Sequence, residues 1–466
     1  MNDTMVKQLR EKASAAGQGH IFRFWDELSR QGKVNLIQQV QSIDFTLLKQ
    51  LKETYLSGAQ NNLFQGELQP PEIIPIPATD QQKMKAAEAK KIGEALLSRG
   101  KVAALLVAGG QGSRLGFDGP KGMYTIAPIS RKSLFQLHAE KIAALQSKYG
   151  AVIPWFIMTS ETNHDETVAF FQRHRFFGLS EGDVYFFRQG MIPALDGQGS
   201  MFLDAKDHIF TNPNGHGGTL NALRDNGCLD EMKARGIEEI FYFQIDNVLI
   251  KICDPTFLGY HRENKAEMSA KLVSKRDPYE KVGVVGWLNG KLAVIEYSDL
   301  SVADKEARNS DGSLKFRGGS IAIHVFHVPF IENEISQAKL PYHLAFKKIP
   351  HLDEQGRLVE PAKPNGYKFE MFIFDALQDA RAAVLMEVDR KKEFSPVKNK
   401  EGSDSAETAR QDLVDYYADM LKQAGVAIPA GNGLIEIDAR FALDAEDLKR
   451  KIDPGQINVE FPLYLQ

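Results

Sequence analysis

Cysteine, long apolar runs and excess basic charge are all scarce in this chain, and each shortage excludes a class of protein. Among the 466 residues there are two cysteines, Cys228 and Cys253, which are too few for a disulfide framework or a zinc site. Both stand among apolar residues, so we expect unreactive thiols in the core. No stretch approaches the roughly 18 consecutive apolar residues of a transmembrane helix. The N-terminus also lacks the apolar core of a signal peptide, and we expect a cytoplasmic protein.

The charge balance is almost even. The formal net charge is −4, and no basic block suggests a nucleic-acid or membrane surface. With 43% hydrophobic and 25% charged residues, the composition is that of an ordinary globular protein. Single cores stop growing at about 250–300 residues, so we expect two or three domains. Nothing in the sequence indicates an oligomeric state.

The N-terminal part has the apolar spacing of helices. Residues 4–57 carry apolar side chains at intervals of one, three or four, and Asp44 stands where it can cap a second helix. The proline-dense stretch QPPEIIPIPATDQQ predicts an extended linker, because proline suits neither helix nor sheet interior. Thr79 then follows as a candidate cap for a helix that ends at Gly100. The apolar positions are Leu36, Ile37, Val40, Ile43, Leu47, Leu48 and Leu51.

Beyond Gly100, short apolar runs alternate with helical patterns, which is typical of an α/β fold with a parallel sheet. From about residue 267 the chain becomes rich in strand patterns, and LNGK predicts a hairpin turn. The last part, from about 393, mixes one helix with strand-like LIEID and FALD. We therefore expect segments 1–95, 96–392 and 393–466. The expected strands are 102–108, 154–160, 183–189 and 239–247, and the expected helices are HDETVAFFQRH, TLNALRDNGCLDEMKARG and 133–150.

Glycine and positive charge gather directly after the first expected strand, in LLVAGGQGSRLGFDGPKG. Ligands bind at the carboxyl ends of strands in such sheets, so the place suits a site. The Walker pattern fails because Gly122 follows Lys121, and the dinucleotide pattern fails because its third glycine would have to stand at Leu115. Glycines let backbone N–H groups approach an anion, and Arg114 and Lys121 can neutralise phosphate. Two cations beside this loop favour a triphosphate or pyrophosphate ligand.

The loop and a series of later motifs resemble the eukaryotic-type UDP-sugar pyrophosphorylases, most closely their acetylglucosamine branch. LLVAGGQGSRLGFDGPKGMYTI with SRKSLFQLHAEKI resembles their nucleotide-binding signature. The similar motifs keep the order of the family and run from about residue 100 to 411. They continue through WFIMTSE, FFRQGMIPAL, NPNGHGG, QIDNVLIKICDP, VGVVGWLNGKLAVIEYSDL, KPNGYKFEMFIFDAL and EFSPVKNKEGSDSAETARQ.

This resemblance implies a three-part protein with a Rossmann-like nucleotidyltransferase domain built on a mixed sheet. An N-terminal helical segment would precede that domain, and a small C-terminal α+β domain would follow it. The implied reaction joins UTP and a sugar 1-phosphate, with Mg²⁺, to give a UDP-sugar and pyrophosphate. The phosphate oxygen of the sugar attacks the α-phosphorus of UTP directly. Such a transfer needs positioning and cancellation of charge more than covalent help.

The resemblance also assigns residues to the nucleotide. Gly109 and Gly110 would receive UTP, and Gln189 would read the uracil edge, since an amide can both donate and accept. Gly215 would bring backbone against uracil or ribose. The catalytic cations implied are Arg114 and Lys121, on the departing phosphates, and Lys398.

Asp246 follows the strand EIFYFQI, where a carboxylate can hold Mg²⁺ that bridges phosphate oxygens. Val248 stands where glycosyltransferases have a second acid, so phosphates and water would complete the metal shell. Taken alone, an aspartate at a strand end is often only a helix cap or turn former. Single lysines are typical of a solvated surface.

On the sugar side, the resemblance implies contacts from Glu296 and Tyr297. Lys368, like Lys398, is one of the late cations of the family, and both would approach the phosphates from the opposite side of the cleft. Lys398 lies near the expected start of the C-terminal segment, whose closure would complete the site. The sugar-binding set is completed by His216, Asn247 and Ser320.

Two departures bear on which sugar is used. The acetylglucosamine enzymes read GNGG and GNIANH where this chain reads GHGG and GSIAIH, so His216, Ser320 and Ile323 replace three asparagines. The GHG triplet occurs in glucose-type relatives, which leaves UDP-glucose synthesis as an alternative. His216 is also open to a pH-sensitive or purely structural role.

Two further readings belong to other functional classes. A non-catalytic UDP-sugar binding protein is one of them. All the cations and Asp246 are present, which argues against it. A glycosyltransferase is the other, and the missing second acid disfavours it.

Overall fold

The computed structural model describes residues 3–56, 66–337, 340–429, 431, 433–457 and 459–466. Close contacts divide the chain into two compact units. Unit 1 comprises Met1–Gln65, Gly190–Gly218 and Leu340–Ile373, and unit 2 comprises Gly66–Gln189, Thr219–Lys339 and Phe374–Gln466. Within the described ranges, no helix is long and apolar enough to cross a membrane.

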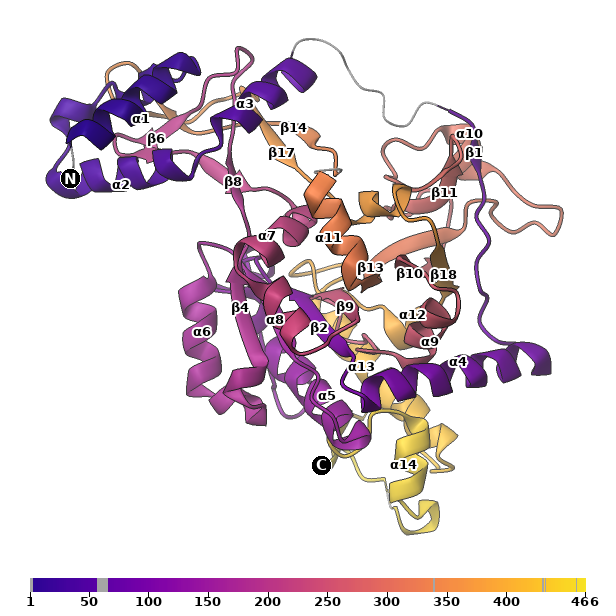
Figure 1. The fold of residues 1–466 in the computed structure, drawn as a ribbon. Coiled ribbons are helices and arrows are strands. Elements are labelled where there is room, and N and C mark those ends of the chain that lie inside the picture. Colours follow the sequence, from indigo (N-terminus) through magenta and orange to yellow (C-terminus); the bar gives the residue numbers. More distant parts are fainter. Residues whose placement is uncertain (1–2, 57–65, 338–339, 430, 432, 458) are drawn as a thin grey trace. The chain divides into compact units, whose positions relative to one another are not determined.

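Unit 1 joins N-terminal helices to two later excursions of the chain (Figure 1). As predicted, Asp44 caps a helix: its Oδ1 accepts hydrogen bonds from the N–H groups of Thr46 and Leu47 at 2.9 and 3.0 Å. Residue 57, the predicted end of the helical part, lies outside the described residues. The helices are α1 (Asp3–Ala15), η1 (Gly19–Phe22), η2 (Trp25–Glu27), α2 (Arg30–Ser42), α3 (Phe45–Leu51), η3 (Lys52–Leu56) and η8 (His216–Gly218).

The strands of unit 1 are short antiparallel pairs. Their apolar side chains share a core with the helices, in which Leu36, Leu195 and Phe369 are fully buried. The pairs are β5 (Met191–Pro193) with β8 (Thr211–Pro213), β6 (Leu203–Ala205) with β7 (His208–Ile209), β14 (His343–Lys347) with β17 (Gly366–Glu370), and β15 (His351–Leu352) with β16 (Leu358–Val359).

Ten strands of the described residues form one mixed sheet in unit 2, in the order β1-β11-β13-β9-β2-β3-β4, with β12 beside β11 and with β10 pairing both β13 and β18. Strands β9, β2, β3 and β4 are parallel, whereas β13 is antiparallel to β9. The predicted α/β class with a mixed sheet is confirmed. The strands are β1 (Leu68–Gln69), β2 (Val102–Val107), β3 (Trp155–Thr159), β4 (Val184–Arg188), β9 (Glu239–Gln244), β10 (Met268–Ser274), β11 (Val284–Leu288), β12 (Lys291–Ile295), β13 (Gly318–His327) and β18 (Ala383–Glu387).

Helices of unit 2 begin and end largely where the sequence predicts. Thr79 and Gln82 form a reciprocal capping box at the start of α4, and Gly150 ends α5 in the left-handed conformation. The single helix expected at 219–236 is wrong, because Gly227 adopts a φ of 71° and separates two helices. The helices are α4 (Asp80–Ser98), α5 (Leu134–Tyr149), α6 (His164–Arg173), α7 (Thr219–Asp225), α8 (Cys228–Ala234), α9 (Pro255–Glu263), α10 (Val302–Glu306), α11 (Val328–Gln337) and α12 (Arg390–Glu393).

The proline-rich linker and the hairpin also follow the prediction. Residues 70–79 run extended, and Ile74 forms a parallel bridge with Met386. In LNGK, Asn289 and Gly290 both have positive φ, 51° and 78°, as a tight two-residue turn between β11 and β12 requires.

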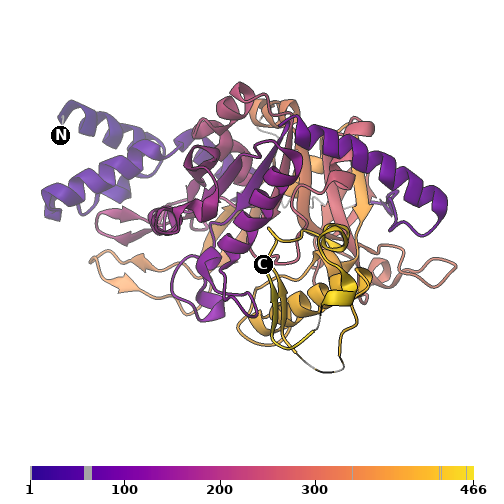
Figure 2. The same ribbon diagram turned by 90° about the horizontal axis from the view of Figure 1, so that it is seen from below.

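The C-terminal segment packs on the α5 side of unit 2, and both views show it next to that helix (Figures 1 and 2). Lys132 ties the two together through ion pairs with Glu140 at 2.7 Å and Asp438 at 2.6 Å. Residues 441–444, predicted as a strand, form a turn instead, because Asp444 caps the following helix. The expected boundary at 393 stays a prediction. The elements here are α13 (Ala406–Gln423), β19 (Ile435–Ile437), α14 (Ala445–Lys451) and β20 (Leu463–Leu465).

Both cysteines are buried. Burial raises the pKa of the Cys228 thiol to about 12, with Glu231 adding to the effect. Burial also raises the pKa of Cys253. Since the thiolate is the reactive form, the structure agrees with the prediction of unreactive core thiols.

Candidate active site

The glycine-rich loop leaves the carboxyl end of β2 and folds back on itself. The N–H of Lys121 donates to the carbonyl of Gly110 at 3.1 Å, and Gly112 N–H donates to Gly119 O at 2.9 Å. Asn163 anchors the base of the loop, since its Nδ2 donates to the carbonyl of Ala108 at 2.9 Å. The sequence analysis did not predict this role of Asn163, although an amide side chain four residues after the end of β3 was a feature that could have indicated it.

Gln189 lies directly against the loop, as its predicted role requires. A Cβ added to Gly109 would stand 3.1 Å from both the Nε2 and the Oε1 atoms of Gln189. The backbone of Gln189 is held in turn, because its N–H donates to the carbonyl of Thr159 at 2.8 Å. At Gly110 an added Cβ would meet nothing within 4 Å. The loop thus presents open backbone at Gly110, beside an amide edge.

Two cations and one carboxylate act on Lys121 beside this loop. Burial lowers the pKa of Lys121, Arg114 and Lys398 lower it further, and Asp246 opposes them. Lys121 and Asp246 keep only 8% and 9% of their surface exposed. The structure therefore brings together four residues that the sequence places at 114, 121, 246 and 398.

None of the three cations forms a close ion pair with a carboxylate of the described residues. Among the described residues, no carboxylate oxygen lies within 4.0 Å of the side-chain nitrogens of Arg114, Lys121 or Lys398. Lys398 Nζ instead lies 5.9 Å from the ring centre of Phe394. Lys121 is buried, and the like charges of Arg114 and Lys398 disfavour its charged form, so an anion of several charges would relieve the repulsion. A polyphosphate meets that requirement.

Lys398 reaches the group because its segment is bridged to that of Asp246. Val397 N–H donates to the carbonyl of Asp246 at 2.9 Å, and Asn247 forms a bridge with Pro396. The side chain of Asn247 donates to the carbonyl of Glu393 at 2.7 Å and accepts from the N–H of Ser395 at 3.0 Å.

Asn247 is 4% exposed, and both ends of its amide bind backbone. The resemblance assigns it to the sugar, but its visible contacts fasten the segment that carries Lys398. Glu393 and Ser395, the partners of this clamp, were not singled out from the sequence.

The predicted sugar residues Glu296 and Ser320 lie at the same edge of the sheet as Asp246. Strand β13 is antiparallel to β9, so its first residues are at the carboxyl end of β9. Ser320 N–H donates to the carbonyl of Gly283 at 2.8 Å. A Cβ on Gly283 would stand 3.4 Å from Glu296 Oε1. Tyr297 follows Glu296 and is 40% exposed.

Gly215 and His216 belong to unit 1. Gly215 has a φ of 83°, and an added Cβ would stand 2.4 Å from the carbonyl oxygen of Met371, so only glycine fits. His216 Nδ1 accepts a hydrogen bond from the N–H of Ile373 at 3.1 Å, and its ring stacks on Phe372. Burial, with His343 adding, lowers the pKa of His216 to about 4. The imidazole is therefore neutral near pH 7, and a pH-sensitive role there is not supported.

Lys368 also belongs to unit 1, on β17 opposite Ala345 of β14. Its Nζ lies 5.2 Å from the ring centre of Phe210, a cation–π contact. The roles assigned to Gly215, His216 and Lys368 stay predictions.

A metal at this place would have one protein carboxylate. No group of three or more His, Cys, Asp or Glu residues in the described part of the chain could hold a metal ion. Mg²⁺ commonly keeps waters and binds through one or two carboxylates and substrate phosphates. Asp246, beside the cations of the glycine-rich loop, fits that pattern.

The sequence of the chain matches a known protein family. Residues 47–442 match the family model described as UTP–glucose-1-phosphate uridylyltransferase. The chain belongs to this family. The predicted membership among UDP-sugar pyrophosphorylases is thereby confirmed.

Individual relatives are similar over nearly their whole length. The UDP-N-acetylhexosamine pyrophosphorylase-like protein 1 of Xenopus tropicalis is 39% identical, over 89% of this chain and 84% of its own. The UDP-N-acetylglucosamine pyrophosphorylase of Saccharomyces cerevisiae is 37% identical, over 93% and 95%. The crystal structure of the uridine diphosphate N-acetylglucosamine pyrophosphorylase from Trypanosoma brucei, solved with an inhibitor, superposes with a TM-score of 0.84 at 27% identity, and the match covers 100% of this chain and 98% of that one.

Proposed function

We propose that this uridylyltransferase joins UTP and N-acetylglucosamine 1-phosphate to give UDP-N-acetylglucosamine and pyrophosphate. The observation that carries the proposal is the group in which Arg114, Lys398 and Asp246 act on the buried Lys121, beside the open backbone of Gly110. The sugar is proposed from the relatives in Xenopus and yeast, whose names specify N-acetylated sugars.

In this proposal the protein positions the substrates and stabilises charge. A phosphate oxygen of the sugar phosphate forms a bond to the α-phosphorus, and the bond from that phosphorus to the oxygen that bridges the α- and β-phosphates breaks. The electron pair leaves with pyrophosphate. Arg114 and Lys121 would neutralise the leaving group, and Lys398 the reacting phosphates. Because Lys121 is buried, its charge acts with little screening by water.

Gln189 is proposed to read uracil. Its amide lies against Gly109, and an amide can satisfy both the donor and the acceptor of the uracil imide edge. Cytosine has a donor in place of the O4 acceptor and an acceptor in place of the N3–H donor, so the amide would have to turn over to bind it. UTP should therefore be preferred over CTP.

We also propose Mg²⁺ as the metal, held by Asp246 with phosphates and water. When bound, the ion supplies positive charge to the phosphate oxygens. Asp246 itself would also offset the repulsion among the three cations. A cytoplasmic location remains a prediction from the sequence.

The sugar pocket departs from the N-acetylglucosamine pattern, which keeps UDP-glucose synthesis as a second candidate. Ser320 and Ile323 stand where asparagines are expected, and Ile323 is only 1% exposed. An apolar buried residue cannot donate to an acetyl carbonyl. We propose that Glu296, beside Gly283 at the same sheet edge, accepts hydrogen bonds from sugar hydroxyl groups. Both sugars have such hydroxyl groups.

The test is pyrophosphate release with UTP, Mg²⁺ and four sugar 1-phosphates: N-acetylglucosamine, N-acetylgalactosamine, glucose and galactose. Release with N-acetylglucosamine 1-phosphate, at a kcat/KM at least about tenfold above that for glucose, supports the proposal. Faster release with glucose 1-phosphate would replace it with the second candidate. Tight UTP binding without release from any sugar would mean a binding protein.

The same panel on Ser320→Asn and on the double variant Ser320→Asn/Ile323→Asn tests the pocket. If this edge contacts the acetyl group, the restored amides raise the preference for N-acetylated sugars. Val325→Ala on the same strand is a matched control, because it removes side-chain volume without adding an amide. If the ratio of kcat/KM for N-acetylated sugars to kcat/KM for the other sugars is equal in all variants, this sheet edge has no role in the choice of sugar.

A further inference from the structure

A cavity of about 290 Å³ lies in unit 2 where the C-terminal segment meets α4, α5 and the chain after β9. It is separate from the glycine-rich loop, none of whose residues lines it. Much of its wall is apolar. The apolar lining includes Leu145, Leu249, Ile252, Leu413, Met420 and Leu443.

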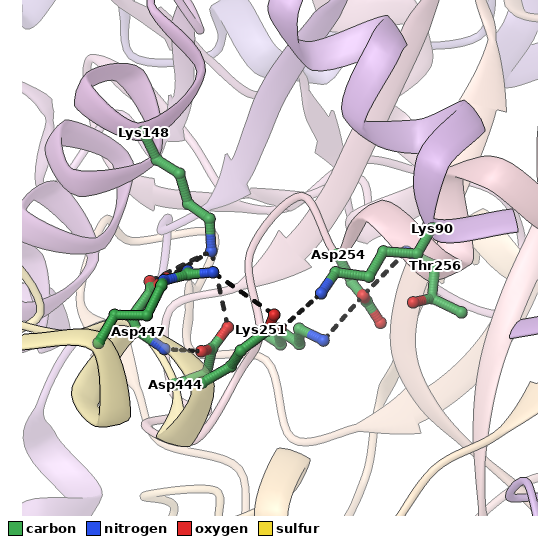
Figure 3. A network of polar contacts seen from close by, with 9 residues as sticks. Lys90, Lys148, Lys251, Asp254, Thr256, Asp444 and Asp447 are labelled. Carbon is green, nitrogen blue, oxygen red and sulfur yellow. Dashed lines mark hydrogen bonds and ion pairs between the residues drawn. The ribbon is translucent and has the colours of Figure 1, made fainter. Parts of the chain in front are cut away.

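Three of the four lysines that line this cavity are neutralised by carboxylates. Two of these ion pairs, those of Lys90 and Lys148, also fasten the start of α14 to the rest of unit 2, and Figure 3 shows Lys148 reaching Asp444 and Asp447 there. The pairs are Lys90 with Glu446 at 2.8 Å, Lys148 with Asp447 at 2.9 Å, and Lys251 with Asp254 at 3.1 Å.

Lys141 is the fourth lysine and differs from the others. Its Nζ donates to the carbonyls of Val248 and Ile250 at 2.7 and 3.0 Å. No carboxylate oxygen of the described residues lies within 4.0 Å of it. An ammonium group has three N–H donors, so one remains for a ligand. Lys141 is half-buried and lines the cavity.

Tyrosine hydroxyls supply further donors. Tyr149, Tyr416 and Tyr417 line the same cavity. Burial raises the pKa of Tyr416 to about 12, with Lys251 opposing, and burial likewise raises that of Tyr149. These hydroxyls therefore stay protonated near neutral pH and can donate to an anion.

We propose that this cavity is a second small-molecule site, which binds an organic anion with one negative charge and an apolar aromatic body. The charge pairs with Lys141, the tyrosine hydroxyls donate to the anionic group, and the apolar wall covers the body. One charge is specified because the ion pairs leave one lysine without a carboxylate. A triphosphate does not fit this chemistry, since its charge would face mostly apolar surface.

Binding should depend on pH through Lys141. Burial lowers the pKa of Lys141 to about 7, with Glu393 opposing, so above that pH the anion can bind only with uptake of a proton. Affinity then falls by up to about tenfold per pH unit above 7. The other titratable groups around the cavity and beside Lys141 are His138, Lys90, Lys148, Tyr149, Lys251, Tyr416, Tyr417, Asp444 and Glu446.

The test uses 8-anilinonaphthalene-1-sulfonate, a fluorescent aromatic monoanion, with the full chain and saturating UTP so that the nucleotide loop is occupied. N-phenyl-1-naphthylamine has the same aromatic body without the sulfonate and serves as the neutral probe. The variants are Lys141→Met, Lys141→Arg and Ala439→Phe, which fills the cavity from its wall. Lys422→Met, at an exposed lysine of α13, is the matched control.

We expect saturable binding of one anion, weakened at least about tenfold in Lys141→Met and in Ala439→Phe, and unchanged in Lys422→Met. Lys141→Arg should keep the affinity and lose its dependence on pH, because guanidinium stays charged. The affinity for the neutral probe should be the same in Lys141→Met and in the unmodified chain. Equal anion affinity in the unmodified chain, Lys141→Met and Ala439→Phe would overturn the proposal, as would absence of saturable binding.

Discussion

The carbonyl of Asp246 accepts a hydrogen bond of 2.9 Å from the N–H of Val397. This bond joins the turn after β9 to the residue before Lys398, although the two are far apart in sequence. It sets the carboxylate and the late cation beside Lys121, whose pKa responds to both. The arrangement of the site therefore depends on how well this bridge is held.

Asn247 is the first test of that dependence. Asn247→Ala removes two hydrogen bonds, to Glu393 O and from Ser395 N–H, and leaves buried backbone groups unpaired. We expect a stability loss of about 1–3 kcal/mol and a fall in kcat of at least about tenfold, with little change in KM for the sugar phosphate. Thermal unfolding and steady-state kinetics measure both. If Asn247 only contacts sugar, KM rises and the melting temperature stays constant.

The cations should matter mainly for turnover. Lys121→Ala removes a preorganised charge from the proposed leaving-group site and Lys398→Ala removes one from the reacting phosphates, and we expect kcat to fall about 100- to 1,000-fold in each variant. Lys391→Ala, at an exposed lysine of α12, is a matched control and should keep full activity. Neither active-site variant should lower the melting temperature, because removing one like charge relieves repulsion. Full activity in both variants would remove the basis of the mechanism.

Much of this site could be predicted from the sequence, because its parts follow strand ends. The glycine loop follows β2, Gln189 follows β4 and Asp246 follows β9, and parallel strands bring their carboxyl ends to one edge. The turn at Asn289 and the cap at Thr79 were equally predictable, because local residues determine them.

What the sequence did not reveal depends on contacts between distant segments. Asn247 binds residues nearly 150 positions away, and Lys141 binds the chain after Asp246 from another helix. Likewise, segments 190–218 and 340–373 join the N-terminal helices, which no local pattern indicates. The Asn226-Gly227 pair could have predicted the end of the helix at Gly227, but the apolar spacing on both sides of it is helical and favoured one continuous helix.

A substitution at Gly110 can test whether the loop binds UTP without disturbing the fold. Its added Cβ would meet nothing within 4 Å, so Gly110→Ala should leave the melting temperature unchanged. If a phosphate approaches that backbone, the methyl group stands in its way, and KM for UTP should rise at least about tenfold. Gly197→Ala, at an exposed and equally open position, is the control. An unchanged KM would mean that UTP does not approach Gly110.

His216 gives a prediction about pH. Its pKa is lowered to about 4 from an ordinary value of 6.5, chiefly by burial, so the folded chain binds fewer protons than the unfolded chain between these values. Stability from the neutral ring is therefore present above pH 6.5 and is lost as pH falls towards 4. His216→Gln keeps an acceptor for Ile373 N–H but does not titrate. Going from pH 7 to pH 5, the unmodified chain should lose on the order of 1 kcal/mol more stability than His216→Gln.

Thermal unfolding of both proteins at the two pH values measures that difference, and His138, present in both, cancels. An equal loss in both proteins would show that His216 titrates normally. The same pair tests the reaction: because the ring is already neutral, the pH profile of kcat/KM between 6 and 8 should keep its shape in His216→Gln. A change of shape would mean that a protonated His216 takes part in binding or turnover.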